Sequence, residues 1–173
     1  MRDTKTKIAA GLERAFAARG FAEPSVEDLR DAAGVSLRTL YKYTPSRSDM
    51  VVVALEYRND RYLERVFSGL PVDPEAALDV VFERVAGWME EEASHGCLFH
   101  AAVGAAPQDP ALQELLRRHK TEMAARTAQA TGLAGREADL TLLIEGLMQS
   151  WPLLRAEAVE SAKRLGRMVI RGK

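Results

Sequence analysis

The fold is decided between residues 25 and 47, which read SVEDLRDAAGVSLRTLYKYTPSR. Ser25 can cap a short helix with its hydroxyl, and this helix is expected to end at Gly34. Ser36 can cap a second short helix, which must stop before Pro45 because proline does not continue a helix. The stretch therefore predicts two short helices joined by a tight turn.

Two helices in this arrangement meet the requirements of a helix-turn-helix. The turn needs a residue that tolerates a positive φ, and Gly34 is such a residue. Apolar side chains are spaced so that they pack between the helices: Leu29, Ala33, Val35 and Leu40. In a helix-turn-helix the second helix lies in the major groove of DNA. The pattern thus favours a protein that binds duplex DNA.

The charge distribution favours the same interpretation. The net charge of -1 argues against general attraction to nucleic acid, but the basic residues are not evenly spread. Residues 36–47 contain Arg38, Lys42 and Arg47 and no acidic residue, whereas the acids upstream lie in the preceding segment. These acids are Glu23, Glu27, Asp28 and Asp31. A polyanion would therefore meet the second helix.

The same residues carry a resemblance to a known family. The motifs are Ala33-Gly34-Val35-Ser36, then Thr39-Leu40-Tyr41, then Tyr43-Thr44-Pro45-Ser46-Arg47. Together with Phe16, Gly20 and Phe21 at the end of the first helix, they resemble the DNA-binding domain of TetR-family transcriptional regulators. The resemblance covers about the first 50 residues.

The chain departs from the family pattern at three places. Arg30 stands where the family favours a small residue, so either its stem turns outward or the helix angle differs. Leu37 and Arg38 stand where the family often has a basic residue followed by a small one. Thr44 replaces the usual aromatic residue before Pro45. These departures bear on the operator sequence more than on the fold.

The resemblance implies which residues contact DNA. Arg38 can donate two hydrogen bonds to guanine O6 and N7, and Thr39 and Tyr43 can reach neighbouring base edges or phosphates. Phosphate contacts fix the position of a protein on DNA without reading sequence. The residues expected to make them are Ser25, Ser36, Tyr41, Lys42 and Arg47. The alternative is that this basic helix pair is only a solvated corner of a helical bundle.

The whole chain has helical periodicity and no strand pattern, which predicts an all-α fold. A helix is expected over 4–19, and a longer one over about 46–69 links the two parts of the protein. Further helices are expected over 74–94, 98–106, 110–131, 137–151 and 155–170. We predict a DNA-binding domain at 1–47. Residues 48–173 have the length and helix count of the family's larger helical bundle for ligand binding and dimerisation.

Composition limits the class of protein. The chain has 173 residues, of which 47% are hydrophobic and 28% charged, so it can bury one sizeable core. Its longest apolar run, residues 50–55, is far shorter than the roughly 18 residues of a membrane span. The apolar stretch from Ile8 to Leu12 is too short for a signal-peptide core before Glu13 and Arg14 interrupt it, and Cys97 has no second cysteine to pair with. We expect a cytoplasmic protein without membrane association.

Two sets of apolar residues are assigned in the larger domain. The family builds an effector pocket among its helices. Residues that can line it here, or belong to ordinary core, are Trp88, Met89, Phe99, Met123, Met148 and Trp151. The last two helices carry apolar stripes that fit the four-helix interface of TetR-like dimers. These residues are Leu140, Leu143, Ile144, Leu147, Val159, Ala162, Leu165 and Val169.

The resulting hypothesis is a ligand-responsive repressor that binds a palindromic operator as a homodimer. A small molecule that prefers the dimer with misplaced recognition helices would release DNA, and the fourth helix would transmit the change. One alternative is a DNA-binding protein without an effector. Another is a helical carrier or enzyme, but the sequence contains no phosphate loop, nucleophile elbow or His-Glu-x-x-His motif.

Metal binding and thiol chemistry are weaker alternatives. His95, Cys97, His100 and His119 are possible soft ligands, but the spacing His-x-Cys-x-x-His matches no familiar site. A sensor role for Cys97 would need neighbours that lower its pKa. We therefore expect no metal, no cofactor and no enzymatic activity.

Overall fold

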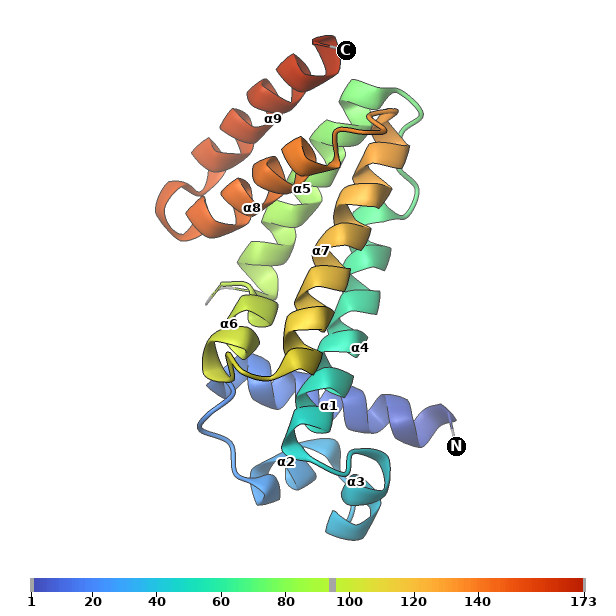
Figure 1. The fold of residues 1–173 in the computed structure, drawn as a ribbon, viewed down its shortest axis with the longest axis vertical. Helices are drawn as coiled ribbons and strands as arrows, with labels where there is room; N and C mark the ends of the chain where they lie inside the picture. Colours follow the sequence, from blue (N-terminus) through green and yellow to red (C-terminus); the bar gives the residue numbers. More distant parts are fainter. Residues whose placement is uncertain (1, 94–95, 173) are drawn as a thin grey trace. The chain divides into compact units, whose positions relative to one another are not determined.

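A computed structural model describes residues 2–93 and 96–172. Over these residues the regular secondary structure is entirely helical (Figure 1), which confirms the all-α prediction. The helices are α1 (Arg2–Arg19), α2 (Val26–Ala33), α3 (Leu37–Tyr43), α4 (Arg47–Phe67), α5 (Pro74–Glu91), α6 (Leu98–Ala105), α7 (Pro110–Thr131), α8 (Glu137–Leu154) and α9 (Ala156–Arg171). No helix in the described ranges is both long and apolar enough to span a membrane.

The start and end of α2 are set by local hydrogen bonds. The Ser25 hydroxyl accepts from the Asp28 backbone N–H, and the Asp28 carboxylate accepts from the Ser25 backbone N–H, which completes a capping box. Gly34 follows the helix with φ of 62° and ψ of 41°, in the left-handed region that glycine adopts without strain. The predicted cap and turn are confirmed.

Asp-Pro pairs begin two of the longer helices in the same local way. The Asp73 carboxylate accepts from the Ala76 backbone N–H at 2.8 Å before α5. The Asp109 carboxylate accepts from the Ala111 backbone N–H at 2.9 Å before α7. Both helices therefore begin where the sequence predicts.

Close packing between α1 and α2 depends on Gly11. A Cβ atom at this position would lie 2.3 Å from the Ala32 carbonyl oxygen and 2.5 Å from the Ala33 Cα atom. Basic side chains of α1 then bond the last carbonyls of α2. Lys7 donates to the Gly34 carbonyl at 3.0 Å, and Arg14 donates to the Ala32 carbonyl at 3.2 Å. α1 thus both supports and caps α2.

The chain packs as two compact units. Unit 1 comprises Met1–Arg61 and Leu98–Leu116, and unit 2 comprises Tyr62–Cys97 and Arg117–Lys173. Residues of α4 and α7 belong to both units, and α6 packs in unit 1. The functional boundary that the sequence suggests after residue 47 stays a prediction.

A buried ion pair joins α1 to α4 within unit 1. The Glu13 carboxylate contacts the Arg58 guanidinium, and both side chains are almost fully buried. Arg61, which is partly exposed, lies 3.3 Å from the same carboxylate. Because a buried charge is costly without its partner, this pair makes the position of α1 depend strongly on α4.

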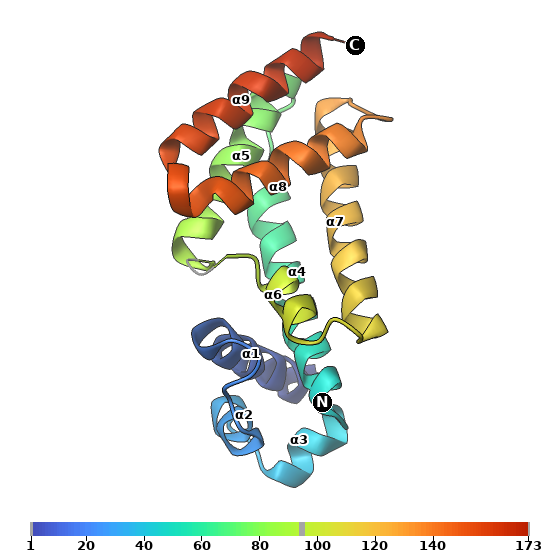
Figure 2. The ribbon, with the colours of Figure 1, turned by 60° about the vertical axis from the view of Figure 1, so that its left-hand side comes forward.

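In unit 2 the helices α5, α8 and α9 pack against one another (Figure 2). Beside them Tyr62 of α4 is buried, with its ring edge-to-face on Trp88 at a centroid distance of 5.4 Å. The Tyr62 hydroxyl contacts the Met123 sulfur at 3.4 Å. Burial raises the pKa of Tyr62 far above its ordinary value, so the side chain is a neutral part of the core.

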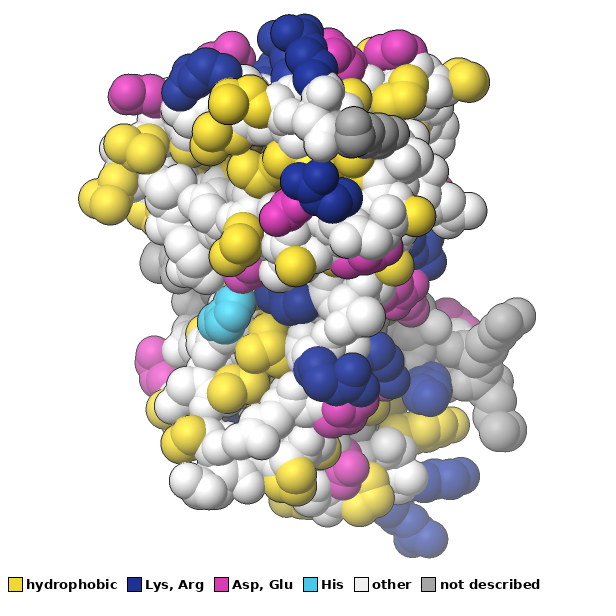
Figure 3. All heavy atoms as spheres, turned by 45° about the horizontal axis from the view of Figure 1, so that its top comes forward, with side chains coloured by type: hydrophobic (Ala, Val, Ile, Leu, Met, Phe, Trp, Pro, Cys, Tyr) yellow, Lys and Arg dark blue, Asp and Glu magenta, His cyan; other side chains and the backbone are white. Residues whose placement is uncertain are grey.

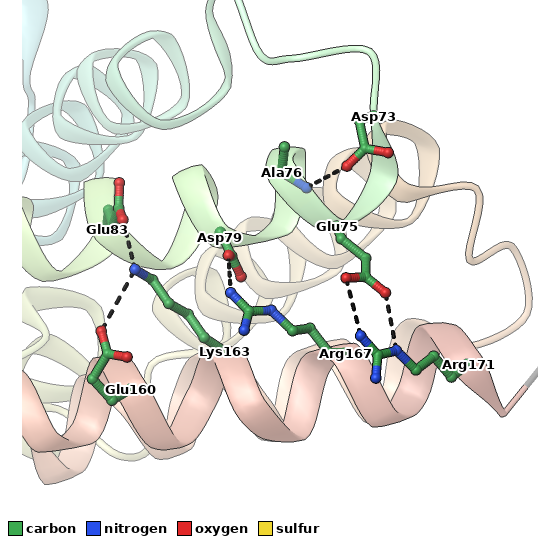
Figure 4. A network of polar contacts seen from close by, with 9 residues as sticks. All are labelled: Asp73, Glu75, Ala76, Asp79, Glu83, Glu160, Lys163, Arg167 and Arg171. Carbon is green, nitrogen blue, oxygen red and sulfur yellow. Dashed lines mark hydrogen bonds and ion pairs between the residues drawn. The ribbon is translucent and has the colours of Figure 1, made fainter.

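A row of ion pairs connects α9 to α5 (Figure 4). Lys163 pairs with Glu83 at 2.6 Å, Arg167 pairs with Asp79, and Arg171 pairs with Glu75 at 3.1 Å. Between them the two helices approach closely at Gly166. A Cβ atom there would lie 2.6 Å from Leu78 Cδ2 and 2.9 Å from Phe82 Cε2.

The end of α8 differs from the prediction. The sequence analysis places it at about Trp151, but the helix continues through Pro152 to Leu154. Proline removes one i−4 hydrogen bond, yet the Arg155 backbone N–H still bonds the Trp151 carbonyl and closes the last turn. Arg155 then changes the chain direction with a φ of 49°.

Candidate nucleic-acid interface

The helix α3 has one buried face and one exposed face. Leu40 is fully buried, whereas Arg38, Tyr41 and Lys42 are exposed. Because no acidic residue lies in α3, its exposed face is positively charged. The helix therefore exposes the side chains of Arg38, Lys42 and Tyr41 to solvent, while Leu40 on its other face is packed in the core.

Ser25 and Ser36, the expected phosphate ligands at the helix starts, both act as N-caps. The Ser36 hydroxyl accepts from the Thr39 backbone N–H at 3.1 Å and lies 2.9 Å from the Thr39 hydroxyl. The Ser25 hydroxyl donates to Asp28 at 2.7 Å. These bonds from Ser25, together with the nearby Arg19 guanidinium, lower the pKa of Asp28. The capping bonds fix both serines at the start of their helices.

Three further residues complete the predicted set. Thr39 and Tyr43 are half-buried, and the Lys42 ammonium lies 6.0 Å from the Tyr43 ring centroid. Arg47 differs from the others because its guanidinium donates to the Phe21 carbonyl at 2.7 Å and lies 5.9 Å from the Phe16 ring centroid. It therefore ties the connection between α1 and α2 to the start of α4.

The departures from the family pattern have local explanations. The Arg30 guanidinium turns to its neighbour Asp31, with Nη2 at 2.6 Å from the carboxylate, so the stem is directed outward. Thr44 is fully buried, and its hydroxyl donates to the Leu40 carbonyl at 2.8 Å. The Thr44 hydroxyl thus adds a second hydrogen bond to a carbonyl that the Thr44 backbone N–H already bonds at 2.9 Å.

The predicted effector residues divide between the units. Phe99 lies in unit 1, and Trp88, Met89, Met123, Met148 and Trp151 lie in unit 2, all of them buried. Three pockets of about 360 to 370 Å³ among the described residues are lined by other side chains. The Trp151 indole N–H is buried and has no hydrogen-bond partner in the described parts of the chain. The assignment of a pocket to these residues stays a prediction.

The residues predicted for a dimer interface differ in how far they are buried. Leu140, Ile144, Leu147, Val159 and Ala162 are buried within their own unit, whereas Leu143 and Val169 are half-buried and Leu165 is 46% exposed. Sequence reasoning missed Leu142 and Met168, which are 73% and 65% exposed.

The exposed members form one surface. A shallow groove of about 370 Å³ is lined by Arg136, Asp139, Leu142, Leu143, Leu165, Met168 and Val169. We call this the α8–α9 patch. Figure 3 shows apolar side chains among charged ones over this end of the molecule. Because these two helices meet only in the fold, the stripe of each helix alone could not locate the patch.

The residues considered as metal ligands have other contacts. The His119 ring is edge-to-face on Tyr62, and the Cys97 sulfur lies 3.5 Å from the Lys120 ammonium. Sequence reasoning missed Lys120 as a neighbour of this thiol. His95 lies outside the described residues. Within them, no group of three or more His, Cys, Asp or Glu side chains is arranged to hold a metal ion.

The two capped helices, the glycine turn and the exposed basic face of α3 define the class: a helix-turn-helix protein. Comparison with known proteins then shows what this part of the chain is similar to. Residues 8–54 match the model for bacterial regulatory proteins of the tetR family. Over these residues the match confirms the resemblance to TetR-family regulators seen in the motifs.

The relatives differ in how much of their length is matched. Over 79 residues the chain is 32% identical to the HTH-type transcriptional regulator EthR of Mycolicibacterium smegmatis. This match covers 44% of the chain and 36% of EthR, so the chain matches about a third of that relative's length.

Solved structures match nearly the whole chain. A TetR-family transcriptional regulator from Streptomyces coelicolor is 19% identical, with a TM-score of 0.75 and coverage of 99% of this chain and 96% of that one. A TetR transcription regulator from Haloarcula marismortui is 18% identical, with a TM-score of 0.76 and coverage of 99% and 98%. At these identities the similarity is one of fold.

Proposed function

We propose that this protein is a DNA-binding transcriptional regulator that reads a palindromic operator as a homodimer. The observation that carries the proposal is the exposed, acid-free face of α3, which presents Arg38, Tyr41 and Lys42 while Leu40 anchors the helix. A recognition helix needs these two faces, because one must pack on its own domain while the other enters the major groove.

The proposed contacts divide into base reading and positioning. Arg38 reads a guanine, since its guanidinium matches the O6 and N7 acceptors, and Thr39 and Tyr43 reach neighbouring base edges or phosphates. Tyr41 and Lys42 contact phosphates. Ser25 and Ser36 support the helix starts and meet phosphate from there. Arg47 reaches phosphate through the N–H groups that Phe21 does not use.

The homodimer is proposed to form through the α8–α9 patch. The exposed Leu142, Leu165 and Met168 would be buried against the same patch of a second copy, as two-fold symmetry requires. A dimer brings two α3 helices to half-sites one turn of DNA apart, about 34 to 36 Å. Binding a palindrome then follows from the symmetry of the protein.

The regulator is proposed to act as a repressor that a small molecule releases. Within unit 2 the buried indole N–H of Trp151 is the group that a ligand's acceptor would satisfy. The tight packing of Tyr62 on Trp88 and Met123 favours the second candidate, a DNA-binding protein without an effector in this unit. Ligand-dependent release of DNA separates the two proposals.

The test is selection of bound sequences from a random pool of duplex DNA with the full-length protein at a stated salt concentration. We expect an enriched palindrome, with two protein chains bound per duplex in light scattering. Enrichment of a single half-site would contradict the dimer. No enrichment, with binding lost at modest salt, would contradict sequence-specific regulation.

Two variants on α3 separate the proposed roles. Arg38→Ala should cost about 1 to 3 kcal/mol on the selected site and relax base preference at one position of each half-site. Lys42→Ala should weaken binding to all sequences alike and reduce the dependence on salt. Equal losses for Arg38→Ala on selected and random DNA would contradict its role in base reading.

A further inference from the structure

Unit 1 contains a pocket that the DNA-binding residues do not explain. Its volume is about 370 Å³, within the range of about 300 to 1,000 Å³ that is usual for small-molecule sites. The floor is apolar and buried, and its side chains are Phe21, Val51, Ala102 and Leu112. These residues come from the α1–α2 connection and from α4, α6 and α7, so the pocket is bounded by segments far apart in the sequence.

The pocket exists because α6 presents small side chains to it. Ala102 lies at the floor, and Ala105 and Ala106 line the wall, so methyl groups stand where larger residues would fill the space. The opposite wall begins with Ser48 in the first turn of α4. The Ser48 hydroxyl donates to the Asp109 carboxylate at 2.5 Å and so connects α4 to the start of α7.

The polar groups at the rim indicate the charge of a ligand. Asp109 is engaged, because one oxygen accepts from Ser48 and the other accepts from the Ala111 and Leu112 backbone N–H groups. These bonds, that of Ser48 above all, lower the pKa of Asp109. Arg47 has donors to spare, since the Phe21 carbonyl is its one hydrogen-bond partner in the described residues. The pocket thus combines an apolar floor with a guanidinium.

We propose that this pocket binds a small apolar carboxylate of the size of benzoate, and that its occupation weakens DNA binding. The hydrocarbon part would cover Val51, Ala102 and Leu112, and the carboxylate would accept hydrogen bonds from Arg47. The effect on DNA rests on the proposed function, whereas the binding of the carboxylate does not.

The coupling to DNA follows from the place of Arg47 in the chain. It stands three residues after Thr44, the C-cap of α3, and it is the first residue of α4. A carboxylate and a DNA phosphate would compete for the same guanidinium. The pocket wall also includes Phe21 and Ala22, which lead into α2. Ligand and DNA therefore oppose each other, and each weakens the other by the same factor.

Alanine methyl groups report directly on occupation. We would label the full-length protein with ¹³C at alanine methyls and titrate it with benzoate, using toluene as the probe that lacks an acceptor. Benzoate should shift the methyl signals of Ala22, Ala102, Ala105 and Ala106 and leave those of Ala124 and Ala128 in unit 2 unchanged. Shifts spread evenly over both units, or found in unit 2 alone, would overturn the proposal.

A matched pair of variants on α6 tests the location. Ala105→Leu places a larger side chain at the exposed rim and should weaken benzoate binding by about tenfold or more. Ala101→Leu adds the same side chain at an exposed position that does not line the pocket, and it should bind like the wild type. Arg47→Gln should weaken benzoate and leave toluene unchanged. Equal effects of the two leucine variants would contradict the site.

DNA binding is then measured with and without benzoate on the selected operator. Saturating benzoate should lower operator affinity by about fivefold or more in the wild type, and Ala105→Leu should need about tenfold more benzoate for the same effect. Localised methyl shifts without any DNA binding by the free protein would overturn the proposed function and leave the carboxylate site standing. DNA binding that benzoate does not change would overturn the coupling proposed here.

Discussion

The helices α2 and α3 differ from α8 and α9 in what defines their ends. α2 and α3 each begin at a serine whose hydroxyl bonds a backbone N–H of the first turn. The N-cap residues of α8 and α9 are Arg136 and Arg155, and neither makes a side-chain capping bond. The two regions therefore show two ways of specifying a helix, by neighbouring residues or by distant ones.

The difference explains which part of the sequence is easy to recognise. Caps and turns need particular residue types at fixed spacing, so the helix-turn-helix leaves a motif such as Ser25 with Asp28 and Gly34. α9 is positioned by packing on α5, which many apolar and charged residues could achieve. The family model accordingly matches residues 8–54.

The first prediction tests whether α2 is specified locally alone. Gly11→Ala should lower the free energy of unfolding by about 3 kcal/mol, because the new methyl group would overlap the Ala32 carbonyl and backbone cannot move away easily. Urea denaturation of the full chain measures the loss. As a control, Gly104→Ala on α6 meets open space and should stabilise by up to about 1 kcal/mol. A neutral Gly11→Ala would show that α2 does not need its contact with α1.

The second prediction concerns the caps. Ser36→Ala removes the hydroxyl that bonds the Thr39 backbone N–H, and it should cost about 1 kcal/mol in urea denaturation. Ser161→Ala in α9 removes a hydroxyl whose one hydrogen-bond partner among the described residues is Arg164, so its cost should stay below about 0.5 kcal/mol. Similar losses at both serines would remove the contrast between the regions.

The third prediction is a pH dependence of the capping box. Because the folded-state pKa of Asp28 lies below its ordinary value of 3.8, ionised Asp28 stabilises the fold above that pH. The advantage is lost as the pH falls through the folded pKa. The stability difference between wild type and Asp28→Asn should be constant near neutral pH and shrink toward pH 3, as followed by denaturation midpoints. Glu27→Gln, in the same turn, is the charge-matched control, and an identical profile for it would refute the assignment.

The fourth and smallest effect is expected at the surface ion pairs of α9. Arg167→Met should lower the melting temperature by about 1 °C, since exposed pairs contribute little. The difference should vanish in about 1 M salt, where charges are screened within about 3 Å. Arg164→Met removes an equal charge from α9 at a residue that makes no ion pair with α5 in the described parts of the chain, so its effect on the melting temperature should be the same at low and high salt. A large loss that persists in high salt would show that the packing of the side chain, not its charge, positions α9.

Prediction from the sequence succeeds where neighbours in the chain decide the structure. The caps at Ser25 and Ser36 and the helix start at Pro110 are of this kind, and each is confirmed. The continuation of α8 through Pro152 was not foreseen, because one lost hydrogen bond in the last turn is tolerated when the next one forms.

Contacts between distant residues could not be predicted. The hydrogen bond from Arg47 to the Phe21 carbonyl joins residues 26 positions apart. It reduces the number of guanidinium N–H groups that Arg47 can donate to a phosphate. The buried ion pair of Glu13 with Arg58 depends likewise on how α1 packs on α4. The pocket lined by Ala102 depends on how α4, α6 and α7 pack together. Periodicity shows which face of a helix is apolar, but not which other helix faces it.

The charges that connect α9 to α5 repeat every four residues on both helices, and this has a consequence for alignment. If α9 slid along α5 by one turn, two of the three ion pairs could form again with new partners. The ion pairs alone would therefore stabilise several registers of α9 on α5 to a similar extent. Gly166 removes this ambiguity, because a slide of one turn would bring Ala162 or Ile170 to the place beside Leu78 where no Cβ atom fits. The absence of a Cβ atom at Gly166 therefore fixes one register of α9 on α5 among those that the repeating charges allow.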